Sequence, residues 1–389
     1  MQTRLSALGA LALLAAMAAA SAVSAQEVYV EEAMFTIPWG DGPGEVGLSP
    51  YAGETGERAG PCHLQLDRHG NIWLLDGHNL AVKCFSPEGD LLRSVGRVEA
   101  DAREQRWGEW NWLAMIGGIR GYAADGRGFA CLLADTFHQH MLVIDPSGEA
   151  VTSRADCYWR LMERRGEEKV LWQLEHETTV DWIGNLDVLA YRRLATDDQD
   201  RLYLLGKAEE QEPGAGTETE WYVFSPDLQY LGKRPGYYCG PDGYTYQFHS
   251  QNTPEDVRLH AWDREGDLVG TRRLAHPEGS WPPCAMPCFD RQQNIYLPCP
   301  VEREQSDEVR LPAEVSETPL TIERDYVLYK FSPAGELLAS VTVPHIRFVG
   351  DDLGSPVAVD ADQDIYYLLP AEDGTHVMRL RLAEDAEGE

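Results

Sequence analysis

Histidine and aspartate side chains gather in two short segments of the chain. They are Asp76 and His78 in the first segment and Asp135, His138 and His140 in the second. Imidazole nitrogens and carboxylate oxygens bind divalent metals, and His138 and His140 project to the same side if their segment is extended. A metal held there could activate a bound water for catalysis. Spacing alone assigns no third and fourth ligand, so ordinary turn residues are the alternative interpretation.

Three tryptophans stand close together between two predicted strands. They are Trp107, Trp110 and Trp112, and polar residues flank them. Such indole rings could stack against sugars or form the centre of a contact with a protein partner. The alternative is that they pin their own loop to the protein, because an indole left in water exposes a large apolar area.

Cysteine positions allow one pairing to be predicted and one to be excluded. Cys62 and Cys84 fall on the first and third strands of one predicted sheet, about 9.6 Å apart across two strand spacings, which is beyond bridging distance. Cys284 and Cys299 fall nearly opposite each other on adjacent strands. We therefore predict a disulfide between Cys284 and Cys299. The sequence contains no serine-nucleophile elbow, phosphate-binding glycine loop or paired Cys-x-x-Cys zinc signature.

The elements that position these residues come from a recurring pattern. A short apolar strand ends in Asp, a tight turn follows, a second strand resembles Asn-Ile-Tyr, and a third strand ends in Phe-Ser-Pro-x-Gly. The best copy runs from Gly60 to Leu92. Other copies of the turn begin at Asp125, Asp197, Asp290 and Asp360, with a degenerate copy at Gly240. Asp with Gly or Asn at fixed offsets builds hairpin turns, and the β-branched and aromatic residues between them suit a pleated sheet.

Six such units predict an all-β chain that folds as a six-bladed β-propeller over residues 26–383. A lone sheet of three or four strands cannot bury its faces, whereas radial packing of repeats buries them and protects the strand edges. The last unit lacks a fourth strand and precedes an acidic tail at 384–389, while an unassigned strand, Val28 to Ile37, precedes the first unit. We therefore expect Val28 to Ile37 to pair with His376 to Leu382 and to close the ring.

The repeat resembles the NHL repeat, whose pattern is Gly-Pro, Asp, Gly-Asn-Ile-Tyr, Asp and Phe-x-x-x-Gly. The copy from Gly60 to Leu92 carries these elements, and Asp135-Thr136 followed by His138 is similar to the Asp-Thr-x-Asn turn of that family. The resemblance implies a six-bladed scaffold. It also implies a binding module in most cases and a lyase or hydrolase in a minority.

Three stretches depart from the regular spacing. The third strands at Ile144 and Phe224 lie 80 residues apart, about twice the usual propeller unit of ~40 to 50 residues. We interpret 152–189 as an insertion because it shows no Asp-turn signature, and a seventh blade is the alternative. The stretches Glu209 to Glu220 and Pro300 to Arg324 are polar and contain proline, so both are predicted to be exposed loops.

The first strand of each blade is expected to line the central channel, where ligands of propellers usually bind. The repeat places there the following residues: His63, Arg120, Arg192 or Arg193, and Tyr237 or Tyr238. Arginine presents a fork of donors to carboxylate or sulfate, so two arginines at the channel mouth could hold such a group. The alternative is that they pair with acidic residues of neighbouring blades.

Charge and the amino-terminal segment limit the partners and the compartment. The chain has 33 Lys and Arg against 64 Asp and Glu, a formal net charge of −31, which disfavours nucleic acids and anionic membrane surfaces. Residues 1–25 are typical of a signal peptide, with Arg4, an apolar run and Val23-Ser24-Ala25 before the predicted cleavage site. We expect a secreted or periplasmic protein, and no segment is long and apolar enough to predict a membrane span.

Two functions follow from these patterns. The first is a binding or scaffold module that contacts a protein, small molecule or carbohydrate through the loop-rich rim and needs no cofactor. The alternative is a metal-dependent lyase or hydrolase with its site at the channel mouth, for which a divalent metal would be the cofactor.

Overall fold

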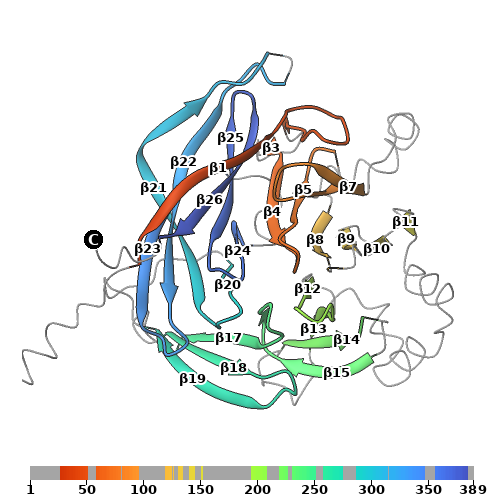
Figure 1. Cartoon of the computed structure of the whole chain (residues 1–389), viewed down its shortest axis with the longest axis vertical. Coiled ribbons are helices and arrows are strands. Elements are labelled where there is room, and N and C mark those ends of the chain that lie inside the picture. Colours follow the sequence, from red (N-terminus) through yellow and green to blue (C-terminus); the bar gives the residue numbers. More distant parts are fainter. Residues whose placement is uncertain are drawn as a thin grey trace, which may run out of the picture.

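The fold is described from a computed structural model, and the regular elements of its described residues are β-strands (Figure 1). The description covers the following residues: 27–50, 58–79, 81–95, 119–124, 126, 130–134, 140–144, 150–151, 194–207, 219–226, 230–250, 257–274, 286–313, 315–346 and 355–383. The predicted signal peptide, the acidic tail and the stretch 152–189 lie outside these residues. The described part of the chain contains no helix that is long and apolar enough to cross a membrane.

The described residues form six four-stranded antiparallel sheets, and five of these are built from consecutive strands. Sheet 1 contains β4 (Pro61–Leu66), β5 (Ile72–Asp76), β6 (Ala81–Phe85) and β7 (Leu91–Val95). Sheet 2 contains β8 (Ile119–Ala124), β9 (Ala130–Ala134), β10 (His140–Ile144) and β11 (Ala150–Val151). Sheet 3 contains β12 (Leu194–Thr196), β13 (Leu202–Lys207), β14 (Thr219–Phe224) and β15 (Tyr230–Pro235).

The remaining sheets complete the set. Sheet 4 contains β16 (Tyr238–Cys239), β17 (Thr245–Ser250), β18 (Val257–Trp262) and β19 (Leu268–Leu274). Sheet 5 contains β20 (Cys288–Phe289), β21 (Ile295–Val309), β22 (Leu320–Phe331) and β23 (Leu337–His345). Sheet 6 contains β24 (Val357–Val359), β25 (Ile365–Ala371), β26 (Gly374–Leu382) and β1 (Tyr29–Ile37). β2 (Ser49–Pro50) and β3 (Arg58–Ala59) pair with each other in a separate two-stranded sheet.

The sheets are arranged radially, with first strands such as β4, β8, β12 and β24 nearest the centre (Figure 1). Apolar side chains fill the seams between neighbouring sheets, as in the cluster that joins Ile72 and Leu74 of sheet 1 to Tyr366 and Val377 of sheet 6. Similar clusters join sheets 3, 4, 5 and 6 in turn. An all-β propeller results, because each sheet buries its two faces only against its neighbours.

The amino-terminal strand completes the last sheet. β1 pairs with β26 in antiparallel register from Tyr29 opposite Leu382 to Ile37 opposite Thr375. The predicted pairing of the first strand with the last strand is therefore confirmed. It joins residues from the two ends of the described chain, so opening the ring requires the loss of this whole ladder.

In four sheets, a buried or half-buried Asp follows the first strand and begins the turn that leads to the second strand. These residues are Asp67, Asp197, Asp290 and Asp360. In sheet 3, Oδ1 of Asp197 accepts the N–H groups of Gln199 (2.9 Å) and Arg201 (3.0 Å). Oδ2 accepts Nε of Arg201 (2.6 Å) and the hydroxyl of Tyr203 (3.0 Å). The Asp of the repeat is therefore a turn residue whose acceptors are occupied within its own hairpin.

In these four turns and in the corresponding turn of sheet 4, the fourth residue has a positive φ, as a hairpin turn with a bulge requires. Glycine occupies it in sheets 1 and 4, at Gly70 (φ 79°) and Gly243 (φ 78°). Sheets 3, 5 and 6 have Asp200 (58°), Gln293 (64°) and Gln363 (70°) instead. A non-glycine residue is strained in this region by about 1 kcal/mol or more, so its side chain must contribute something that glycine cannot.

Those side chains connect their turns to other sheets. The carboxylate of Asp200 accepts the N–H of Gly126 in sheet 2 (2.9 Å) and pairs with Arg68 of sheet 1 (2.7 Å). The amide oxygen of Gln363 in sheet 6 accepts Nζ of Lys330 in sheet 5 (2.6 Å). These contacts offset the backbone strain and link these turns to other sheets.

The longest hairpin corrects one prediction. Residues 300–324 were expected to form an exposed loop, but β21 and β22 extend through most of this stretch and project beyond the sheet (Figure 1). Leu320 and Ile322 are buried in one cluster with Leu48 and Leu75 of the amino-terminal region. The hairpin therefore covers residues that are distant in the sequence. The mainly polar composition of 300–324 gave no indication of this contact.

Candidate functional site

The repeat breaks in sheet 4, and the break creates the most unusual polar site among the described residues. Gly240 stands where the other sheets have Asp, since its N–H donates to the carbonyl of Tyr244 (2.8 Å) and its carbonyl accepts the N–H of Gly243 (2.9 Å), as in the Asp turns. A Cβ atom on residue 240 would lie 2.7 Å from Oδ1 of Asp242. The space of the missing Asp side chain is therefore taken by the carboxylate of Asp242.

Asp242 replaces the missing Asp only in part. Its Oδ1 accepts the N–H of Tyr244 (3.1 Å). Its Oδ2 is buried without a hydrogen-bond partner, and so is the hydroxyl of Tyr246, which holds the position of the ring that donates to Asp in the other sheets. Asp242 is 8% exposed and Tyr246 is 0% exposed. Unsatisfied buried polar atoms are rare, so two of them in one hairpin require an explanation.

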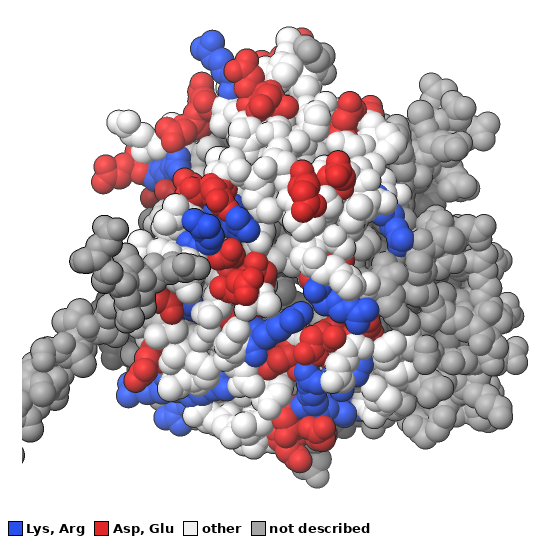
Figure 2. Space-filling view, viewed as in Figure 1, with Lys and Arg blue, Asp and Glu red and all other residues white. Residues whose placement is uncertain are grey.

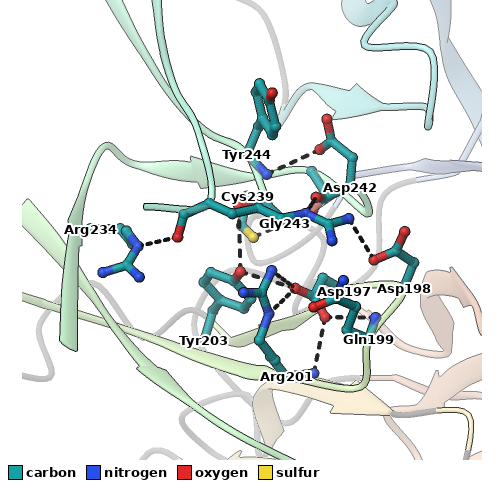
Figure 3. Close-up of polar contacts among 12 residues, drawn as sticks. Asp197, Asp198, Gln199, Arg201, Tyr203, Arg234, Cys239, Asp242, Gly243 and Tyr244 are labelled. Carbon is teal, nitrogen blue, oxygen red and sulfur yellow. Dashed lines mark hydrogen bonds and ion pairs between the residues drawn. The ribbon is translucent and has the colours of Figure 1, made fainter. Parts of the chain in front are cut away.

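The site lies against the complete Asp turn of sheet 3. Figure 3 shows Asp197, Arg201 and Tyr203 beside the turn that runs from Cys239 to Tyr244. The guanidinium of Arg201 pairs with Asp197 at 2.6 Å. A Cβ atom on Gly243 would lie 2.6 Å from Nη2 of Arg201 and 2.8 Å from Oδ2 of Asp197, so only glycine lets the two turns approach this closely.

Arg264 connects the two turns on their outer side. Its Nε donates to the main-chain carbonyl of Asp242 (2.6 Å), and its Nη2 pairs with Asp198 of sheet 3 (2.8 Å). The N–H of Asp198 also donates to the carbonyl of Pro241 (2.8 Å). In Figure 2, acidic and basic side chains lie next to one another around the centre of the molecule, as such pairing requires.

Burial controls the protonation of this site. Desolvation raises the pKa of Asp242 from 3.8 to about 6, and the nearby Arg264 offsets part of that rise. Burial also raises the pKa of the Cys239 thiol and those of the Tyr203 and Tyr246 hydroxyls. The thiol is therefore a poor nucleophile at neutral pH, whereas Asp242 can exchange a proton near neutral pH.

The structure gives Asp76, a predicted metal ligand, a different partner. Asp76 is 0% exposed, and its Oδ2 lies 2.8 Å from Nζ of Lys83, which is 1% exposed. Asp76 also accepts the N–H and the Nδ2 of Asn79 (3.1 and 2.7 Å). His78 pairs with Asp41 instead (3.3 Å). The described residues contain no group of three or more side chains suited to a metal.

Several other predicted site residues cannot be placed. Outside the described residues lie Trp107, Trp110, Trp112, Asp135, His138, Arg192, Arg193 and Cys284. Arg120 and His140 lie on β8 and β10, and nothing is described of their side chains. The disulfide between Cys284 and Cys299 therefore stays a prediction. Cys84 is a free thiol, so the prediction that Cys62 and Cys84 are not bridged is confirmed.

The predicted channel residues that are described occupy different environments. His63 lies at a bulge of β4 with φ 53°. Tyr237 packs against the apolar cluster between sheets 3 and 4, and Tyr238 packs against the one between sheets 4 and 5. Across the first strands, Nε2 of Gln65 donates to the hydroxyl of Thr196 (3.4 Å), a contact that the sequence analysis did not anticipate.

Asp242 was not among the site residues predicted from the sequence. Its signal was the irregularity itself, because Gly240-Pro241-Asp242-Gly243 replaces the first-strand Asp that the other units carry. A position where one unit departs from the repeat is a candidate functional position, because the usual turn interaction is absent there.

Comparison with known proteins finds similarity in structure and not in sequence. No family model matches the chain, and no curated protein matches it. A luciferin-regenerating enzyme matches with a TM-score of 0.41 at 11% identity, over 91% of this chain and 95% of that one. A gluconolactonase from Xanthomonas campestris matches with a TM-score of 0.37 at 12% identity, over 91% and 100% of the two chains. The virginiamycin B lyase of Staphylococcus aureus matches with a TM-score of 0.34 at 8% identity, over 84% and 96%.

Proposed function

We propose that this protein is an extracytoplasmic, six-bladed propeller of the NHL type that acts as a binding module. In this proposal, each four-stranded sheet is one blade. The face that carries the turns between first and second strands binds the ligand, which is a protein, a small molecule or a carbohydrate.

The observation that supports this role is the pairing of charges between turns of different sheets on that face. Arg68 of sheet 1 pairs with Asp200 of sheet 3, and Arg264 of sheet 4 pairs with Asp198 of sheet 3. Turns that neighbouring sheets hold in place lose little conformational freedom when a ligand binds, so more of the contact energy appears as affinity.

The test compares two surface variants of the purified protein on a glycan array and in pull-downs. The first changes exposed turn residues of the proposed face: His69→Ala, Arg291→Ala and Asp362→Ala. The control variant, Glu372→Ala, changes the turn between β25 and β26 at the opposite end of the strands. We expect the first variant to lose the ligand and the control to keep it. Equal binding by both would refute the proposed face.

Two further measurements separate this proposal from its alternatives. A variant with Trp107, Trp110 and Trp112 changed to Ala tests the tryptophan segment as a second contact. Elemental analysis tests the metal-dependent lyase or hydrolase, because a stoichiometric divalent ion that is lost together with an activity would favour the enzyme over the binding module.

A further inference from the structure

The turn of sheet 4 has an unfavourable arrangement if Asp242 is ionised. A carboxylate offers acceptors on both oxygens, yet Oδ2 of Asp242 is buried and has no donor, and the residue is only 8% exposed. A buried carboxylate oxygen without a donor loses its hydration and gains no compensating hydrogen bond, which disfavours the charged form. The hydroxyl of Tyr246 on β17 does not supply that donor, because it is also without a partner. The burial of Oδ2 without a donor therefore favours the protonated acid.

The groups that face Asp242 determine how it responds to a change of pH. From sheet 3 it faces the anion of Asp198, and from its own sheet it faces the cation of Arg264. The groups coupled to it on the inner side, Tyr246 and Cys239, are neutral because burial raises the pKa of each. Arg201 of sheet 3 also lies against this turn at Gly243, but it is paired with Asp197 at 2.6 Å. Arg264 is therefore the cation available to Asp242 when Asp242 loses its proton.

We propose that the sheet-4 turn is a proton-binding site that couples protonation of Asp242 to the contact between sheets 3 and 4 through Arg264. In the acid form, the side chain stays buried and Arg264 joins Asp198 to the carbonyl of Asp242, as the structure shows. When the proton leaves to solvent, the carboxylate competes with Asp198 for Arg264. The contact between the two turns then weakens, and no other reactant is needed.

The rise in the pKa of Asp242 to about 6 supports this proposal and fixes its sign. A carboxyl whose pKa is higher in the folded protein binds its proton more tightly there than in the unfolded chain. Its contribution to stability is complete below pH 4 and is lost as the pH rises through about 6. Neutral conditions therefore weaken the seam and mildly acidic conditions strengthen it.

The experiment measures unfolding of the full mature chain by urea from pH 4 to pH 7.5, in wild type and in Asp242→Asn. Asn keeps the acceptor for Tyr244 and imitates the neutral acid. The matched control is Asp362→Asn, because Asp362 holds the same turn position in sheet 6 and is exposed. We expect the folding equilibrium constant of wild type to fall about a hundredfold relative to Asp242→Asn across this range, whereas Asp362→Asn follows wild type. A constant ratio between wild type and Asp242→Asn would overturn the proposal.

A second measurement applies if Asp242→Asn does not fold. In wild type labelled at the aspartate carboxyl carbons, one resonance should titrate near pH 6. Its midpoint should move upward in Arg264→Gln and downward in Asp198→Asn, because these changes remove a cation and an anion respectively. The absence of any aspartate carboxyl with a midpoint above pH 5 would overturn the proposal. Neither measurement uses a ligand, so the outcome is independent of the proposed binding function.

Discussion

Replacing Asp76 by Asn tests how strongly the buried ion pair with Lys83 stabilises sheet 1. Nζ of Lys83 lies 2.8 Å from Oδ2 of Asp76 and also donates to the carbonyls of Gly42 and Glu45. Asp76→Asn leaves the ammonium buried without a counter-charge. Removing one partner of a buried pair destabilises a protein by about 3 to 5 kcal/mol, so we expect a loss of stability in this range.

Replacing Lys83 should destabilise the protein less than replacing Asp76 does. Lys83→Met keeps most of the side-chain volume and leaves Asp76 with the N–H of Gly47 (3.3 Å) and both donors of Asn79. We expect a loss of about 2 kcal/mol, since the carboxylate loses its charged partner but not its other donors. The double variant should be less destabilised than the sum of the single changes by about 2 kcal/mol, because the two residues interact directly.

Urea unfolding followed by circular dichroism at neutral pH measures all three variants. The control is Glu302→Gln, which breaks the exposed pair of Glu302 with Arg324 and should change stability by less than about 1 kcal/mol. A loss below about 1 kcal/mol in Asp76→Asn, or additive losses in the double variant, would refute the reasoning. Loss of a bound divalent metal on Asp76→Asn would instead support the predicted role of Asp76 as a metal ligand.

Three other predictions concern the turns and one thiol. Asp290→Ala should destabilise the protein by about 2 to 4 kcal/mol in urea unfolding, because it leaves the buried donors of Asn294 and Tyr296 without an acceptor; a change below about 0.5 kcal/mol would contradict the role of the Asp turn. Gly240→Ala should destabilise by about 1 to 3 kcal/mol, because the new Cβ meets Asp242 at 2.7 Å; thermal unfolding at an unchanged or higher temperature would disprove the clash. Burial raises the pKa of Cys84 to about 12, so mass spectrometry should find Cys84 unmodified by iodoacetamide at pH 8 until denaturant is added; rapid labelling of the folded protein would show that the thiol is accessible.

The repeating turns were predictable because their interactions are local. Asp67 satisfies its acceptors with His69, Asn71 and Trp73, all within six residues along the chain. A side chain that meets its partners within one hairpin leaves its signature in a short stretch of sequence. The pairing of the first strand was predictable for another reason. The sixth unit lacked one strand, and β1 was the strand without a unit of its own.

The candidate site was only partly predictable. The sequence revealed that sheet 4 lacks its Asp, but the substitution by Asp242 depends on how the turn folds back and on the approach of Arg264 from another hairpin. The metal interpretation of Asp76 stays a prediction. The sequence did not reveal Lys83 as the ion-pair partner of Asp76, because a lysine in a strand is normally exposed.

By itself, the sequence determined an all-β chain of Asp-turn repeats with an amino-terminal strand reserved for the last sheet, since turn chemistry and strand periodicity act over a few residues. The tertiary structure decided which charged groups are buried and what they contact. The pKa of Asp242 is raised because residues far apart in the chain together exclude water from its carboxyl group. The hairpin of β21 and β22 covers the amino-terminal region through apolar contacts between equally distant residues. Desolvation depends on all neighbours at once, and no local pattern records it.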